Sequence, residues 1–317
     1  MKIFSEELYD FVGHKMAIRS NSIEALNHLR AVYGRFFHGM KKLGEGLKTT
    51  KTNSSRLTVE IIDDFDNTNE MMISDTFYSY KITRTNGRYT FKCRDIRAIN
   101  PEYIGTCNPL HFIQTLILRT LTLMIKDLHL FHAGAVAWRD RGMIFPAHPD
   151  MGKTTMVVKL VMKGCKFLSD EIACLHPELN VLEAFPRRLS IRNQSRKILG
   201  LPPWSEVRNV IKTYDSEAML DIEDLVPNSL IKRATPNYLF FIQGIGDRPR
   251  LGKISRSYAL FELMKYVYST VEDSTALIFK IAPLLDKMNC YHLLIGDINE
   301  TAELVISEVR KGKYEDG

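Results

Sequence analysis

The chain has 317 residues, of which 45% are hydrophobic and 25% are charged, a composition typical of a globular protein with one or two domains. Its formal net charge of +6 suits an acidic ligand. It contains no long block of Lys and Arg, so we expect no nucleic-acid partner. The five cysteines are scattered and form no CxxC pair, which argues against a disulfide framework or zinc site and favours a cytoplasmic location.

Residues 1–100 are predicted to form a small α+β region. Apolar residues recur at helical spacing over residues 22–37, and Ser22 is suited to be the N-cap. Residues 41–56 are rich in Lys, Gly, Ser and Thr and predict a loop. Asn86 and Gly87 form a strong hairpin-turn signal between two strand-like runs. The predicted strands cover residues 57–62, 71–80, 80–85 and 89–93.

Residues 101–317 are predicted to form an α/β domain, because strand-like and helical patterns alternate there. The apolar helical segment 109–128 is interrupted by Arg119 and Lys126, so it is too short for the roughly 20 apolar residues of a membrane span. No membrane association is therefore expected. The acidic segment 204–228 follows two prolines and predicts an excursion over the core. The other predicted strands are 132–138, 143–145, 166–168, 172–175, 238–243 and 291–295, and the other helices are 152–163, 258–268 and 300–310.

The sequence AHPDMGKTT lies at residues 147–155, between a predicted strand and a predicted helix. It matches the phosphate-binding pattern GxxxxGK[ST] except that Ala147 replaces the first glycine. In such loops, backbone N–H groups and the helix N-terminus attract phosphate, the lysine reaches the terminal phosphates, and the hydroxyl binds Mg²⁺. We therefore predict a nucleoside triphosphate site. Its predicted contacts are Ala147, His148, Pro149, Asp150, Met151, Gly152, Lys153, Thr154 and Thr155.

Two loop positions are unusual. Ala147 is acceptable if its φ is negative. The carboxylate of Asp150 would repel phosphate, so we expect it to point outward or to help hold the metal. His148 could contact phosphate but is expected to be exposed. The alternative interpretation is that Gly-Lys-Thr opens an ordinary helix, but the preceding strand and the following amphipathic helix favour phosphate binding.

Three further motifs surround this loop: HAGAV at residues 132–136, LSDE at 168–171 and FPRRLSIR at 185–192. Their order and spacing resemble the HPr serine kinase-related family, which includes the lasso-peptide precursor kinases. The resemblance is strong over about residues 130–195 and weaker over most of the chain. The sequence departs from the family pattern at Ala147, which replaces a glycine, and at Arg188, which replaces a proline.

The resemblance implies a P-loop core of the HPr kinase and phosphoenolpyruvate carboxykinase-like type, following the small N-terminal region. It also implies Mg-ATP as the phosphate donor and a peptide or protein serine as a possible acceptor. HPr kinases form oligomers, so a homo-oligomer is a further expectation, although the sequence contains no interface signal of its own.

The acidic pair supplies the predicted base. Asp170 matches the family's base, and a carboxylate near the γ-phosphate can accept a hydroxyl proton. Adjacent side chains on an extended segment point to opposite sides. We therefore assign Glu171, together with Thr154, as a ligand of the metal, or else as a residue that contacts the ligands of the metal. The alternative is a solvated turn. His132 matches a family histidine that could orient Asp170 or contact phosphate, and a hydrogen-bonded histidine at a strand start is an equal alternative.

The basic residues after the acidic pair are predicted to bind phosphate. Arg187 and Arg192 match the family's basic positions, and a guanidinium can clamp phosphate oxygens. An exposed basic strand is the alternative, and Arg188 is expected to be a surface charge. Trp204 and Tyr214 could stack on adenine or anchor a loop, and the sequence does not choose between these roles.

Three functions remain open from the sequence. The first is an ATP-dependent kinase in which Asp170, His132 and Lys153 are catalytic. The second is a P-loop ATP hydrolase, in which Asp170 would position water. The third is a non-catalytic nucleotide-binding partner of a peptide-modification complex, which the loss of the first loop glycine slightly favours. The presence of Lys153, Thr154 and Asp170 favours an enzyme.

Overall fold

The computed structural model describes residues 4–43, 57–75, 79–86, 88–93, 102–105, 109–212, 217–268 and 274–311. The chain is a mixed α/β protein that divides into two compact units, Met1–Ile125 and Lys126–Gly317. The sequence placed this boundary at residue 100. The difference arises because helix α3 (Pro109–Met124) packs against α1 (Ile23–Tyr33), where Tyr33 donates a hydrogen bond to the carbonyl of Gln114 at 3.0 Å.

The first unit is built on an eight-stranded sheet in the order β3-β1-β2-β4-β5-β6-β7-β8. All neighbouring strands are antiparallel except β2 and β4, which are parallel. The strands are β1 (Phe4–Phe11), β2 (His14–Ser20), β3 (Phe37–Leu43), β4 (Leu57–Asp64), β5 (Glu70–Ser74), β6 (Ser79–Thr85), β7 (Arg88–Cys93) and β8 (Glu102–Gly105). The short helices η1 (Gly34–Phe36) and α2 (Phe65–Thr68) complete the described elements.

Local signals placed several of these elements. The hydroxyl of Ser22 accepts a hydrogen bond from the N–H of Ala25 and caps α1, as predicted. The predicted helix ends at Tyr33, because η1 and then β3 follow. The hairpin of β6 and β7 turns at Asn86, whose φ is 49°. Of the predicted loop 41–56, residues 41–43 belong to β3 and the remainder lies outside the described residues.

The second unit is centred on β17 (Arg233–Ile245), which lies between two parallel neighbours, β10 (Arg141–Pro146) and β19 (Asn289–Ile295). An antiparallel strand, β18 (Arg250–Lys253), follows β19 at the edge. Strand β9 (His129–Trp138) pairs with β10 on one side. Its other side pairs in turn with β11 (Lys166–Ser169) and β12 (Ile172–His176), and β13 (Val181–Glu183) connects β12 to β17.

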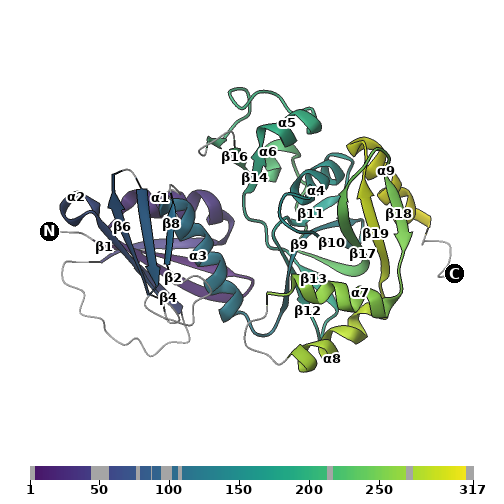
Figure 1. Ribbon diagram of the computed structural model, residues 1–317, viewed down its shortest axis with the longest axis horizontal. Coiled ribbons are helices and arrows are strands. Elements are labelled where there is room, and N and C mark those ends of the chain that lie inside the picture. Colours follow the sequence, from purple (N-terminus) through teal and green to yellow (C-terminus); the bar gives the residue numbers. More distant parts are fainter. Residues whose placement is uncertain are drawn as a thin grey trace. The chain divides into compact units, whose positions relative to one another are not determined.

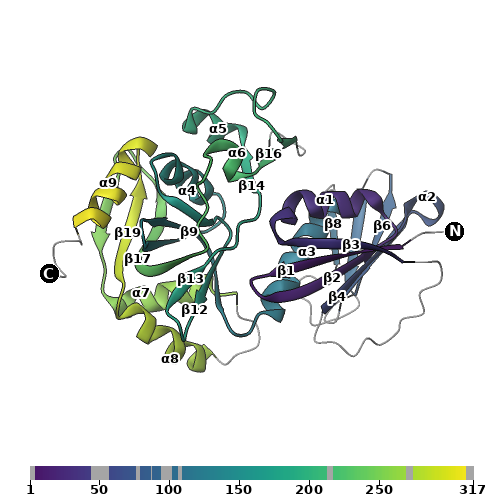
Figure 2. The same ribbon diagram turned by 180° about the vertical axis from the view of Figure 1, so that it is seen from behind.

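Helices cover both faces of this sheet (Figures 1 and 2). Successive side chains of a strand point to opposite faces, so Phe240 joins one buried cluster and Phe241 the other. The first cluster includes residues of α4 (Lys153–Met162) and α9 (Ile298–Lys311), and the second includes residues of α7 (Arg256–Leu263) and α8 (Ser274–Leu285). Helices 152–163 and 300–310 correspond to α4 and α9. The predicted helix 258–268 ends earlier, because η2 (Met264–Tyr266) follows α7, and α8 was not predicted.

The second unit also contains a separate three-stranded sheet, which adjoins α4 and has the order β14-β16-β15. Its strands are β14 (Leu189–Arg192), β15 (Ile211–Lys212) and β16 (Glu217–Leu220), accompanied by α5 (Asn193–Leu199) and α6 (Ile222–Leu225). The predicted excursion 204–228 thus contains regular structure. Trp204 packs against the buried cluster that contains α4, with the guanidinium of Arg196 5.7 Å from its ring centroid, as expected for a loop anchor. Tyr214 lies outside the described residues.

Three cysteines of the second unit, Cys165, Cys174 and Cys290, are buried free thiols. Cys165 belongs to the core cluster that contains α4, and Cys290 belongs to the cluster on the opposite face of the sheet. Among the described helices, none is both long enough and apolar enough to span a bilayer.

Candidate active site

The predicted phosphate loop connects the end of β10 at Pro146 to the start of α4 at Lys153. Gly152 is the N-cap of α4 with φ 87°, a conformation that favours glycine, and no side chain caps this end of the helix. A Cβ at Gly152 would also lie 3.2 Å from Cδ1 of Ile295. The N–H groups of the first turn therefore lack a side-chain acceptor from the cap, and together with the helix dipole they suit an anion.

The two unusual loop residues are accommodated. Ala147 is buried and is not among the residues with positive φ, so replacing glycine there introduces no backbone strain. Asp150 has φ 67° and points outward, where Oδ1 lies 2.6 Å from Nη1 of Arg192. Both side chains of this pair are mostly exposed, so Arg192 lies at the outside of the loop in this structure. His148 is exposed, as expected, with its ring 5.1 Å from that of Tyr266.

Lys153, the first residue of α4, carries the buried amino group of the site. Its Nζ lies 2.6 Å from Nε2 of His132 and 3.9 Å from Oε2 of Glu171. Burial lowers the pKa of Lys153, while the charges of Glu171 and Asp170 oppose this shift. Gly134 of β9 allows α4 to approach closely, because a Cβ there would lie 2.4 Å from Cγ2 of Val157 and 3.4 Å from Cγ of Lys153.

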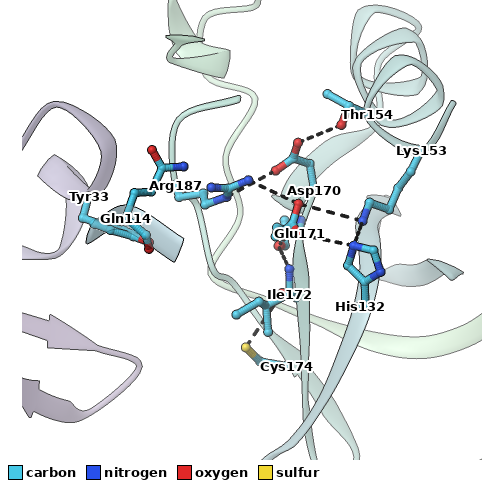
Figure 3. A network of polar contacts seen from close by, with 11 residues as sticks. Tyr33, Gln114, His132, Lys153, Thr154, Asp170, Glu171, Ile172, Cys174 and Arg187 are labelled. Atoms are coloured by element: carbon cyan, nitrogen blue, oxygen red, sulfur yellow. Dashed lines mark hydrogen bonds and ion pairs between the residues drawn. The ribbon is translucent and has the colours of Figure 1, made fainter. Parts of the chain in front are cut away.

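Asp170 and Glu171 occupy the turn between β11, which ends at Ser169, and β12, which begins at Ile172. The hydroxyl of Ser169 accepts hydrogen bonds from the N–H groups of Glu171 and Ile172, at 3.3 and 3.1 Å. Because the backbone turns here, the alternation expected of an extended segment does not apply. Both carboxylates lie toward Arg187, whose Nη2 is 3.2 Å from Oε2 of Glu171 and whose Nε is 3.9 Å from Oδ1 of Asp170 (Figure 3).

The two carboxyl groups have opposite pKa shifts. Asp170 is only 1% exposed, and burial raises its pKa, while Arg187 and Lys153 act in the other direction. Burial would also raise the pKa of Glu171, but the hydrogen bond with His132 and the charges of Arg187 and Lys153 outweigh it and lower the pKa to about 2. Such a divergence within a pair separates an acid-base group from a permanently charged one. It favours Asp170 as the base and Glu171 as an ionised anchor.

His132 of β9 lies beside Glu171, with Nε2 3.2 Å from Oε1 of that carboxylate. Together with the 2.6 Å contact to Lys153, this places His132 with Glu171 and Lys153. The sequence had left open a histidine that orients Asp170 or contacts phosphate and a hydrogen-bonded histidine at a strand start. The opposite end of the site is formed by Thr154, which donates a hydrogen bond from Oγ1 to Oδ2 of Asp170 at 3.1 Å. Arg188 donates to the carbonyl of Asn209 at 2.8 Å, in keeping with a role outside the site.

Two residues of this region were missed in the sequence. The ring of Tyr268 meets that of His132 edge to face at 5.8 Å, and burial, with the charge of Glu171, raises the pKa of its hydroxyl. Ser195 of α5 accepts a hydrogen bond from Thr155 at 2.9 Å. Neither residue belongs to a recognisable motif, and both reach the site only through pairing of distant segments. No local pattern could have identified them.

The metal assignment of Thr154 with Glu171 changes with the geometry. The oxygens of Glu171 face Arg187, His132 and Lys153, so Asp170 is the carboxylate beside Thr154. Oδ1 of Asp170 is buried and has no hydrogen-bond partner among the described atoms. Within the described part of the chain, no three His, Cys, Asp or Glu side chains form a metal-binding group. Mg²⁺ commonly takes one or two carboxylates together with phosphate and water, so the oxygens of Thr154 and Asp170 fit it.

No family model and no curated protein matches the sequence. Among solved structures, the chain is similar to the HPr(Ser) kinase/phosphatase from Coxiella burnetii, with 11% identity and a TM-score of 0.32. The match covers 59% of this chain and 99% of that chain. At so low a TM-score, the site geometry remains the basis for inferring a function.

Proposed function

We propose that this protein is an ATP-dependent kinase that transfers the γ-phosphate of Mg-ATP to a hydroxyl group, with serine in a peptide or protein as the acceptor. The observation that carries the proposal is the buried Asp170 beside Thr154, at an uncapped helix N-terminus that begins with Lys153. The uncapped helix N-terminus suits an anion, and it lies next to a carboxylate whose pKa is raised by burial. The resemblance of the surrounding motifs to HPr kinase-related proteins supports the same reaction and a P-loop core of that type.

Positive groups surround the proposed phosphate position. Lys153 and Arg187 are both buried, and each lies within 4 Å of a carboxylate oxygen that orients it. The N-terminus of α4 adds backbone N–H donors. Phosphoryl transfer depends mainly on such positioning and charge neutralisation. Bound Mg²⁺ would neutralise further negative charge on the phosphates, and Thr154 and Asp170 are the residues suited to hold it.

Asp170 is assigned as the base that accepts the proton of the acceptor hydroxyl. As the serine oxygen forms its bond to the γ-phosphorus, the bond from that phosphorus to the β,γ-bridging oxygen breaks and ADP leaves. The hydroxyl proton passes to Asp170, whose raised pKa makes it a better base than an exposed aspartate. Glu171 stays ionised and holds Arg187 and His132 in place.

The proposal is tested with γ-labelled ATP, Mg²⁺, and serine-containing peptides paired with copies in which each serine is replaced by alanine. Label on the serine peptide but not on its alanine copy is the expected result. Labelled inorganic phosphate with no labelled peptide would instead indicate a hydrolase. Tight ATP binding without any movement of label would indicate a non-catalytic nucleotide-binding protein.

A further inference from the structure

The positive charge of this chain is concentrated in one segment, residues 185–212, which contains β14, α5 and β15. The segment holds seven Lys and Arg residues and a single acid, Glu206, so its formal net charge is +6. The whole chain also has a net charge of +6, and the remaining residues are therefore balanced, with 36 of each sign. Such a local excess of one sign attracts ligands of the opposite sign.

This segment adjoins the candidate active site. The hydroxyl of Thr155, in the first turn of α4, donates a hydrogen bond to Ser195 of α5 at 2.9 Å. The preceding residue, Thr154, donates to Asp170 at 3.1 Å. Helix α5 therefore begins beside the residues that are proposed to act on the acceptor hydroxyl, and it lies next to α4 in both views of the ribbon (Figures 1 and 2).

Two arginines of the segment are bound to neutral groups. Arg188 donates to the carbonyl of Asn209 at 2.8 Å, and Arg196 donates to the carbonyl of Leu201 at 3.0 Å. These bonds hold the loop between α5 and β15 against β14 and α5. A carbonyl orients a guanidinium without neutralising it, so both positive charges remain.

Two further cations are exposed, Lys197 in α5 and Arg208 in the loop that follows it. Within the described part of the chain, neither side chain has an ion-pair or hydrogen-bond partner. Together with Arg188 and Arg196 they form a group of four cations, which we call the α5 basic surface. Glu206 is the acid of the same segment, and one carboxylate does not balance four cations.

Acids on neighbouring elements have other partners. Arg192 has two acids beside it, Asp150 of the phosphate loop at 2.6 Å and Glu217 opposite it on β16. It is therefore not counted in the α5 basic surface. Asp224 and Glu223 of α6 accept local hydrogen bonds, Asp224 from a side-chain amide and Glu223 from three backbone N–H groups.

We propose that the α5 basic surface binds an acidic segment of the acceptor, next to the serine that receives the phosphate. This inference rests on the proposed function, because it assigns a phosphorylated serine to the ligand. Carboxylates of the acceptor would form charge-assisted hydrogen bonds with Lys197 and Arg208. Complementary charge also favours one partner over others and speeds its encounter with the site.

The test uses two fluorescent peptides that carry the same serine, flanked by four Glu residues in one and by four Gln residues in the other. Anisotropy is measured with a saturating non-hydrolysable ATP analogue and Mg²⁺, so that the phosphate loop is occupied. We expect the Glu peptide to bind at least about tenfold more tightly in 50 mM NaCl. The difference should shrink in 500 mM NaCl, because salt screens exposed charges.

A double variant locates the binding surface. Lys197→Gln combined with Arg208→Gln should weaken binding of the Glu peptide about threefold to tenfold and leave the Gln peptide unaffected. The matched control combines Arg250→Gln with Lys253→Gln. It removes the same charge from exposed side chains of the edge strand β18 and should bind the Glu peptide as the unaltered protein does.

Several results would overturn the inference. These are equal affinity for the two peptides, equal loss in the two double variants, and tighter binding of a single-stranded oligonucleotide of equal charge. Transfer from γ-labelled ATP separates the inference from the proposed function. Equal labelling of the two peptides would leave the kinase standing and overturn the acidic site. Selective binding of the Glu peptide without any transfer would overturn the kinase and leave the acidic-peptide site standing.

Discussion

At the scale of single residues, Glu171 connects most of the site. Arg187, His132 and Lys153 all approach its two oxygens. Asp170, its neighbour, has fewer partners and a raised pKa. One carboxylate therefore organises the cationic groups while the other is left to accept a proton, and the two can be tested separately.

Replacing Lys153 by alanine should abolish ATP-dependent turnover. Loss of its charged contact to phosphate should also weaken Mg-ATP binding about tenfold or more, measured by titration calorimetry. The fold should persist, because burial of the charged amino group of Lys153 is unfavourable and alanine removes that group. Lys163→Ala, at the exposed far end of α4 beside Glu303, is the matched control. Normal turnover in Lys153→Ala would refute the assignment of the site.

Replacing Asp170 by asparagine should abolish transfer, while Mg-ATP still binds through the phosphate loop, more weakly because one of the two proposed Mg²⁺ ligands loses its charge. The amide keeps the shape of the carboxylate but lacks its basicity, so we expect transfer to slow by at least about 100-fold. Single-turnover experiments with γ-labelled ATP measure this rate. Asp224→Asn is the control, since Asp224 is an exposed acceptor for Asn209. Transfer at the parental rate would show that Asp170 is not the base.

The ionised Glu171 should stabilise the fold in a pH-dependent way. Its pKa falls from 4.5 to about 2 on folding, so its contribution is complete above pH 4.5 and is lost as the pH falls toward 2. The shift corresponds to at most about 3 kcal/mol. Glu171→Gln should therefore lower the free energy of urea unfolding at pH 7, with a difference from the unaltered protein that shrinks below pH 4.5. A difference that is independent of pH would contradict this.

At the scale of elements, the sequence identified the unit of β10, loop and α4, because strand, glycine and helix signals are all local. It also placed β11, β12, β19 and α9 approximately. It left a turn at Asp170 and Glu171 open as an alternative and did not predict that both carboxylates lie toward Arg187, because the hydrogen bonds of Ser169 that bend the backbone leave no pattern in the sequence. The contact of Tyr268 with His132 was likewise unpredictable, since it depends on a bridge between Val267, which follows η2, and Phe131 of β9.

The close approach of β9 and α4 gives a prediction for Gly134. Alanine at this position would place its Cβ 2.4 Å from Cγ2 of Val157, so α4 must shift. Overpacking of this kind costs about 1–3 kcal/mol, and the shift should also weaken Mg-ATP binding through Lys153. Gly252→Ala is the control, because a Cβ there meets nothing within 4 Å. Chemical denaturation and nucleotide titration measure both effects, and equal stability of the two variants would exclude a tight contact.

At the scale of the whole molecule, the sequence predicted a small α+β region over residues 1–100 followed by an α/β domain, whereas the two compact units divide after α3. The apolar pattern of 109–128 predicts a helix without indicating which core it joins. That choice is made by contacts with α1, such as the one between Tyr33 and Gln114, whose sequence separation hides them. The specific P-loop kinase type remains a prediction.

Because the residues of the site all belong to the second unit, nucleotide should protect that unit in particular. Mg-ATP at 100 times its Kd should add about 2.7 kcal/mol to the stability of the state that binds it. Hydrogen exchange followed by mass spectrometry should show slower exchange in peptides covering 147–155 and 168–175. The Lys153→Ala variant provides the control and should show little change. Equal protection of the strands β1–β6 would contradict a site confined to the second unit.

The buried thiols of the second unit have a practical consequence. Burial raises the pKa of Cys165 to about 12 and that of Cys290 to about 11, and the thiolate is the form that reacts with alkylating agents. These two side chains lie in core clusters on opposite faces of the same sheet. Iodoacetamide should therefore modify each one only when its own helical layer detaches, so peptide-level labelling can follow the separation of α4 and α9 independently of that of α7 and α8, without any introduced probe.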